Sequence, residues 1–166
     1  MKLKKLAVLA LLTAASLILF VIELNFPTLA PVPGIKLGLA NIITVYAVYS
    51  FTAGETAMVL AVRILLGALI AGEPFTLIFS FSGGLLCLAG MLLLRKVIDK
   101  KHIWVCSVLG AVLHNVGQLT AAFFVMNTSA VLAYAPFLLA AGCLAGALTG
   151  FAAQFVISRL KGRIDI

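Results

Sequence analysis

Charge is what this sequence has least of. Only 10% of its 166 residues are charged, against about 25% in soluble domains, and 64% are hydrophobic. A water-soluble fold of this length could not bury so much apolar surface, which excludes an ordinary soluble domain. The sequence therefore predicts an integral membrane protein, for which lipid replaces water as the solvent.

Residues that bind metals or carry redox chemistry are also scarce. There are only two histidines, His102 and His114, and three cysteines that stand singly inside apolar runs. None of them has the close spacing that a zinc or redox site requires. We interpret the cysteines as small packing residues and expect neither a metal site nor a cofactor. They are Cys87, Cys106 and Cys143.

Long hydrophobic runs fill most of the chain, and short polar segments divide them. A membrane-crossing helix needs about 20 predominantly apolar residues. On that measure the runs predict an all-α bundle of six transmembrane helices, within a single integral membrane domain over residues 1–166. The second and third runs are short, and the boundary between them is the least defined. The predicted spans cover residues 6–24, 37–51, 56–70, 75–94, 103–126 and 131–157.

Basic residues concentrate in three segments: the N-terminus, the link between the fourth and fifth runs, and the C-terminus. Cytoplasmic segments carry such an excess of Lys and Arg, and six spans place all three segments on one side. We therefore expect a multi-pass protein of the cell membrane with both termini cytoplasmic. No cluster belongs to a polar domain that could present it to nucleic acid. The clusters are Lys2, Lys4 and Lys5; Arg95, Lys96, Lys100 and Lys101; and Arg159, Lys161 and Arg163.

The first twenty residues also resemble a secretory signal, with a basic start, an apolar middle and small residues near Ala14 and Ala15. However, the apolar run continues past that point to Leu24, and its removal would leave five spans. We expect the first helix to be retained.

Arg63 lies near the middle of the third predicted span, and an ionisable residue at membrane depth is a candidate functional group. The alternatives are a side chain that snorkels to the membrane surface and a structural pair with Glu55 or Glu73. Glu55 is about 12 Å away along a helix that rises 1.5 Å per residue, which is too far for a local pair. Ligand binding and bundle organisation both stay open.

The fifth run carries three polar residues, His114, Asn115 and Gln118, near its middle. His114 and Gln118 are four residues apart and therefore share a helix face. Hydrogen bonding between helices, which is common in membrane bundles, and direct contact with a ligand are both consistent with this pattern.

Lys36 and Asn41 flank the start of the second predicted span, beside Gly34 and Gly38. The topology puts Lys36 at the outer mouth and Asn41 about 7 Å deeper by helical rise. Glycines there would let the backbone approach a ligand closely. These groups could form the rim of an outward-facing pocket. The alternative is that Lys36 is an interfacial anchor and Asn41 a contact between helices.

Small residues mark two further faces. Gly142, Gly146 and Gly150 recur every four residues in the last span, which predicts close helix packing. Ala10 and Ala14 form an Ala-x-x-x-Ala step in the first span, which would ordinarily indicate packing within the bundle.

Four segments together resemble a known family: "PGIKLGLANI", "AVRILLGALIAG", "FSFSGGLLCLAGM" and "GAVLHNVGQLTAA". They are similar to the membrane family called Gx transporter, also labelled heptaprenyl diphosphate synthase component I, from about residue 6 to residue 157. That family is in turn similar to the substrate-binding S-components of energy-coupling-factor vitamin transporters. Those proteins are six-helix bundles with a pocket near the outer face.

The resemblance implies a substrate-binding subunit of an ATP-driven uptake transporter for a small polar or anionic molecule. It also implies that Ala10 and Ala14 dock on a transmembrane coupling subunit that carries two ATPases. No nucleotide-binding loop is visible in this chain, so ATP use would belong to those partners. The expected substrate-binding residues are Lys36, Asn41, Arg63, His114, Asn115 and Gln118.

The synthase label suggests a different function. Prenyl diphosphate synthases resemble one another in aspartate-rich motifs that hold magnesium, and this chain has only Asp99 and Asp165, both in basic segments. We expect no independent catalysis. The alternative to a transporter is a non-catalytic membrane accessory subunit in isoprenoid or quinone biosynthesis, or in extracellular flavin electron transfer.

Overall fold

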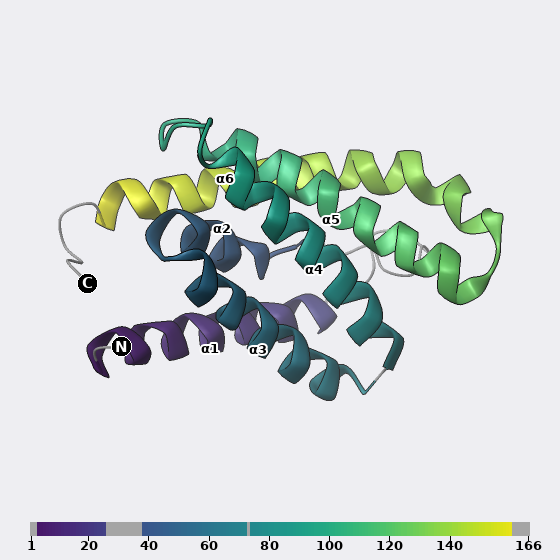
Figure 1. Cartoon of the computed structure of the whole chain (residues 1–166), viewed down its shortest axis with the longest axis horizontal. Helices are drawn as coiled ribbons and strands as arrows, with labels where there is room; N and C mark the ends of the chain where they lie inside the picture. The colour runs from purple at the N-terminus through teal and green to yellow at the C-terminus, as the bar shows by residue number, and fades with distance from the viewer. Residues whose placement is uncertain (1–2, 26–37, 73, 161–166) are drawn as a thin grey trace.

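The computed structural model describes residues 3–25, 38–72 and 74–160, and all regular structure within them is helical. The prediction of an all-α bundle is confirmed (Figure 1). The elements are α1 (Leu3–Asn25), α2 (Asn41–Ser50), α3 (Ala53–Ala71), α4 (Pro74–Leu94), α5 (Ile103–Met126), the short 3-10 helix η1 (Ser129–Tyr134) and α6 (Ala135–Leu160).

Five of the described helical segments are long and apolar enough to cross a membrane, and α2 is not among them. Its 10 residues extend about 15 Å at 1.5 Å per residue, half of a hydrocarbon core about 30 Å thick. The predicted count of six spans is therefore not confirmed, because the second predicted span, 37–51, contains only this short helix. The backbone at Gly38 has a φ of 73°, and the turn that follows it precedes α2, which begins only at Asn41.

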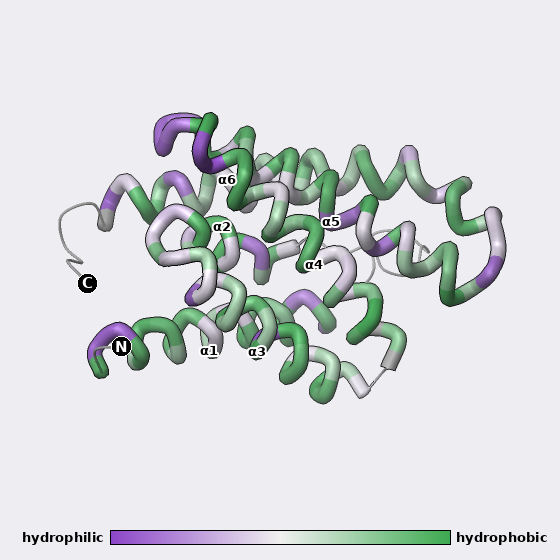
Figure 2. Tube along the Cα trace, in the orientation of Figure 1, coloured by the Kyte–Doolittle hydropathy of each residue, from purple (hydrophilic) through white to green (hydrophobic). Residues whose placement is uncertain are grey.

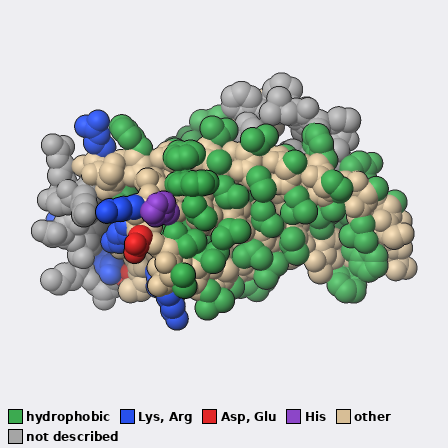
Figure 3. All heavy atoms as spheres, turned by 90° about the horizontal axis from the view of Figure 1, so that it is seen from above, with side chains coloured by type: hydrophobic (Ala, Val, Ile, Leu, Met, Phe, Trp, Pro, Cys, Tyr) green, Lys and Arg blue, Asp and Glu red, His purple; other side chains and the backbone are tan. Residues whose placement is uncertain are grey.

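One end of the bundle contains the start of α1, the link between α4 and α5, and the end of α6 (Figure 1). Hydrophilic residues gather there, whereas the helices are mostly hydrophobic elsewhere (Figure 2). Figure 3 shows the same division on one face, with charged side chains at this end and hydrophobic ones over the middle. We call it the basic end. The grouping agrees with the expected topology, while the cytoplasmic location of this end stays a prediction.

Local signals define both ends of α3. The Thr52 side chain accepts a hydrogen bond from the Glu55 backbone N–H, and the Glu55 carboxylate accepts one from the Thr52 N–H, which is a capping box. Glu55 also pairs with Lys5 at 2.8 Å, tying α1 to α3. Gly72 ends the helix with a φ of 70°, a conformation that favours glycine.

The glycine face of α6 packs against α5. A Cβ atom at Gly146 would lie 2.9 Å from the Val108 Cα, and one at Gly150 would lie 2.6 Å from the Trp104 Cα. Gly142 would crowd the Asn115 side chain. Glycine is needed at these positions because the two backbones approach more closely than any side chain would allow.

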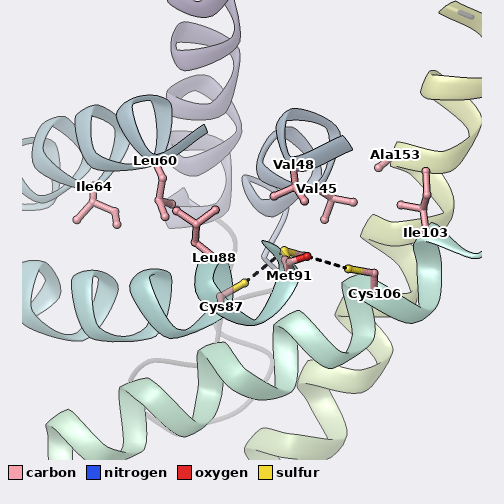
Figure 4. Close-up of a cluster of buried hydrophobic side chains, with 10 residues drawn as sticks. All are labelled: Val45, Val48, Leu60, Ile64, Cys87, Leu88, Met91, Ile103, Cys106 and Ala153. Carbon is pink, nitrogen blue, oxygen red and sulfur yellow. Dashed lines mark hydrogen bonds between the residues drawn. The ribbon is translucent and has the colours of Figure 1, made fainter. Parts of the chain in front are cut away.

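A core of apolar side chains joins five helices near the basic end (Figure 4). Its members are all apolar or cysteine side chains, and they come from α2, α3, α4, α5 and α6. They are Val45, Val48, Leu60, Ile64, Cys87, Leu88, Met91, Ile103, Cys106 and Ala153.

Candidate functional site

An internal cavity of about 70 Å³ lies between the helices, and all six α-helices contribute to its wall. It is smaller than the roughly 300–1,000 Å³ of typical small-molecule sites, although it has room for several waters. Its wall is unusually polar for a membrane bundle. The polar lining residues are Glu23, Asn41, Arg63, Ser80, Ser107, His114, Asn115, Gln118 and Thr149.

Five of the six predicted binding residues line this one cavity. They come from the consecutive helices α2 and α3 and from the more distant α5, so their convergence depends on the fold. Whether they bind a substrate stays a prediction. The five are Asn41, Arg63, His114, Asn115 and Gln118, and the sixth, Lys36, lies outside the described residues.

Ala40 and Asn41, at the start of α2, form part of the cavity wall. The Asn41 N–H donates to the Gly38 carbonyl at 2.9 Å, closing the turn that precedes the helix. Asn41 is therefore the first residue of α2. Its depth of about 7 Å beyond Lys36 stays a prediction, because Lys36 lies outside the described residues. The N-terminus of a helix carries the positive end of its dipole, and the N-terminus of α2 lies at the cavity wall.

Arg63 is the buried cation of the site. It projects from α3, only 8% of its surface is exposed, and its Nε has no hydrogen-bond partner among the described residues. Pairing with Glu55 does not occur, because Glu55 binds Lys5 at the basic end. The second suggested partner, residue 73, lies outside the described residues. A buried guanidinium with an unused donor could bind an acidic or carbonyl group.

Glu23 is a lining residue that the sequence reasoning missed. Its side chain is 8% exposed, accepts a hydrogen bond from the Gly38 N–H, and interacts electrostatically with Arg63. It therefore links α1 to the turn before α2 and places a negative charge near the Arg63 guanidinium. The sequence did contain a signal for Glu23, because it is a carboxylate near the end of an apolar run. Placing an ionisable side chain such as Glu23 or Arg63 within a membrane costs free energy, which makes both residues functional candidates.

The polar residues of α5 have separate surroundings. The Asn115 Nδ2 donates to the Leu138 carbonyl of α6 at 2.6 Å, so bonding between helices is present at this residue. His114 and Gln118 face α4, where a Cβ on Gly83 would lie within 3.0 Å of both side chains. All three also line the cavity, so a structural role for Asn115 does not preclude contact with a ligand.

Ala10 and Ala14 lie away from the cavity, on an exposed face of α1. Their exposure is compatible with docking on a partner, which stays a prediction. Within residues 3–25, 38–72 and 74–160, no group of three or more metal-ligating side chains comes together.

Five helical segments able to cross a bilayer, packed around an internal polar cavity, define a polytopic membrane protein. The family model for heptaprenyl diphosphate synthase component I matches residues 12–156, so the chain belongs to that family. The comparisons find no curated protein and no solved structure that matches the chain.

Proposed function

We propose that this chain is the substrate-binding subunit of an ATP-driven uptake system and holds a small polar or anionic molecule in the internal cavity. The observation that carries the proposal is Arg63, buried beside that cavity with an unused Nε donor. An Arg at the centre of a membrane helix costs about 2.5–3.5 kcal/mol on insertion scales. A ligand that accepts hydrogen bonds from the guanidinium would explain why an arginine is present at this costly position.

The other lining groups suit the same ligand. The N-terminus of α2 favours negative charge, and the amide and imidazole groups of Asn41, His114 and Gln118 can orient polar atoms. The cavity volume of about 70 Å³ favours a compact molecule over one the size of a flavin. Phe20 is the aromatic side chain in the described wall, which gives little surface for stacking a large ring.

The direct test is retention of the ligand. The protein is purified in mild detergent, and mass spectrometry identifies small molecules that remain bound to it. Arg63→Ala and Lys36→Ala should each reduce retention about tenfold or more, because hydrogen bonds to charged groups contribute about 1.5–3 kcal/mol. Arg159→Ala, at the basic end, is the matched control and should retain the ligand. Equal retention by all variants would exclude this assignment.

The transport component rests on the resemblance to S-components that the sequence motifs imply, and the exposure of Ala10 and Ala14 on α1 is compatible with it. Ala10→Leu with Ala14→Leu should reduce co-purification of a coupling subunit and its ATPases while the ligand stays bound. Ala140→Leu, on an exposed part of α6, is the control. Loss of ligand and partner together would indicate a folding defect, which the control and a melting curve detect.

The family name supports a second candidate. Heptaprenyl diphosphate synthase component I implies a protein partner in prenyl diphosphate synthesis. On this hypothesis the chain is a non-catalytic membrane subunit that anchors or organises the enzyme. Affinity purification at native expression distinguishes the two: recovery of a prenyltransferase supports the second candidate, and recovery of ATPases supports the first.

A further inference from the structure

A second pocket lies at the basic end, on the other side of the apolar core from the internal cavity. Its volume is about 330 Å³, and it lies between the end of α2 and the link that joins α4 to α5. We call it the basic pocket. Its lining residues are Val48, Tyr49, Arg95, Lys96, Ile98, Asp99 and Lys100.

Arg95 is held in a fixed position in this pocket. Its Nη1 donates to the Val48 carbonyl at 2.6 Å and to the Phe51 carbonyl at 3.2 Å, at the C-terminal end of α2. These bonds satisfy carbonyls that the helix leaves without partners, and they suit the negative end of its dipole. Both bonds use one nitrogen, so the donors on Nε and Nη2 have no partner among the described residues.

The pocket has an excess of positive charge. Arg95, Lys96 and Lys100 face a single carboxylate, that of Asp99. A planar guanidinium combined with two ammonium groups is the typical recognition set for phosphate oxygens. Lys and Arg also accumulate in cytoplasmic loops simply because they set the orientation of a membrane protein. That role alone would require neither a pocket nor an Arg95 side chain held by two carbonyls.

Apolar side chains adjoin these charges. Val48 and Ile98 form part of the wall, and the Val97 side chain beside it is 85% exposed. The apolar part of α4 ends at Leu94, directly before Arg95, so the pocket lies where a bilayer's acyl region would meet its head groups. A bound molecule could therefore place a charged group in the pocket and an apolar chain in the membrane.

We propose that the basic pocket binds the phosphate or diphosphate head group of an amphiphile. The site is separate from the internal cavity, and the proposal does not depend on the ligand of that cavity. An anionic phospholipid and a prenyl diphosphate share this chemistry, and a soluble phosphate lacks the chain.

Binding is measured on the full-length protein in phosphatidylcholine nanodiscs, with geranylgeranyl diphosphate, phosphatidylglycerol and inorganic pyrophosphate as separate probes. Lys96→Gln and Lys100→Gln should each weaken binding of the chain-bearing probes about fivefold, and the double variant about thirtyfold, because each substitution removes a direct hydrogen bond to the phosphate group that contributes about 1 kcal/mol. The relative affinity of the two chain-bearing probes identifies the head group.

Lys101→Gln is the matched control, since Lys101 belongs to the same link but does not line the pocket. It should bind like the unaltered protein. Wild-type affinity in the double variant, or an equal loss in Lys101→Gln, would overturn the proposal. Equal binding of inorganic pyrophosphate and geranylgeranyl diphosphate would overturn the assignment to an amphiphile.

Discussion

The same helices build two contrasting halves of this bundle. Near the basic end, α3, α4 and α5 contribute Leu60, Leu88 and Cys106 to an apolar core (Figure 4). Farther along, α3 and α5 contribute Arg63 and His114 to the internal cavity. On α5, which begins at the basic end, the core residue Cys106 precedes the polar residue His114. On α3 the two sets overlap, because Arg63 lies between the core residues Leu60 and Ile64.

The two halves differ in what their side chains do: those of the core pack the helices together, and the polar ones of the cavity include candidates for ligand binding. Lipid does not drive helices together through hydrophobicity, so a membrane bundle is stabilised by close packing and hydrogen bonds. The core half meets that need with buried apolar side chains that pack against one another. The cavity half combines polar groups that join helices, such as the Asn115 amide bonded to the Leu138 carbonyl, with the buried Arg63 guanidinium, whose Nε has no partner among the described residues. Arg63 is the group that packing does not require, as expected of a binding site.

The largest effect should come from overpacking the contact between α4 and α5. A Cβ at Gly117 would lie 2.8 Å from the Gly83 Cα and 2.8 Å from the Ser82 carbonyl oxygen. Backbone atoms cannot move aside, so Gly117→Ala should destabilise the protein by about 1–3 kcal/mol in thermal unfolding in detergent.

The matched substitutions are in the core half and on the surface. At Gly110 the obstacle is the flexible Met91 side chain, so Gly110→Ala should cost less. Gly54 has open space around it, and Gly54→Ala should be neutral or gain up to about 1 kcal/mol. If Gly110→Ala proved more destabilising than Gly117→Ala, the claim that backbone atoms yield less than the Met91 side chain would be wrong.

The next effect should separate binding from stability. Ala145 lines the cavity, and Ala145→Leu would place three additional carbons in it. Retention of the cavity ligand should fall about tenfold, which corresponds to about 1.4 kcal/mol, while the melting temperature stays close to that of the unaltered protein.

Cys143→Leu is the control for this experiment. Cys143 is exposed on α6 and does not line the cavity, so the added bulk should change neither property. A variant Ala145→Leu that binds normally would show that the cavity is not the ligand site.

The smallest effect should come from the helix cap at the basic end. Thr52→Ala removes the side-chain acceptor for the Glu55 N–H and should destabilise the protein by about 1 kcal/mol without altering ligand retention. Thr120→Ala removes an exposed hydroxyl that bonds to the Val116 carbonyl within the same helix, and it should have less effect. Thermal unfolding of the two variants side by side tests this difference.

The sequence was sufficient for the helical class and for much of the polar clustering. Apolar length identified the bundle, and the scarcity of polar residues in the runs made Asn41, Arg63 and His114 conspicuous. Their meeting at one cavity follows from the general cost of polar groups in lipid.

Other features depended on contacts between distant segments. Composition could not show that α2 is only half a span, because an apolar run of intermediate length fits a short buried helix as well as a crossing one. The position of Glu23 inside an apolar run was visible in the sequence, but its proximity to Arg63 was not, because that proximity joins α1 to α3.

The central claim is that the polar cavity holds a ligand against Arg63 and the start of α2. An electron cryomicroscopy map of the protein purified with its natural ligand would test it most directly. We expect compact non-protein density within hydrogen-bonding distance of the Arg63 guanidinium and of Asn41. A cavity filled by a lipid acyl chain, or an Arg63 side chain turned towards the membrane surface, would contradict the claim.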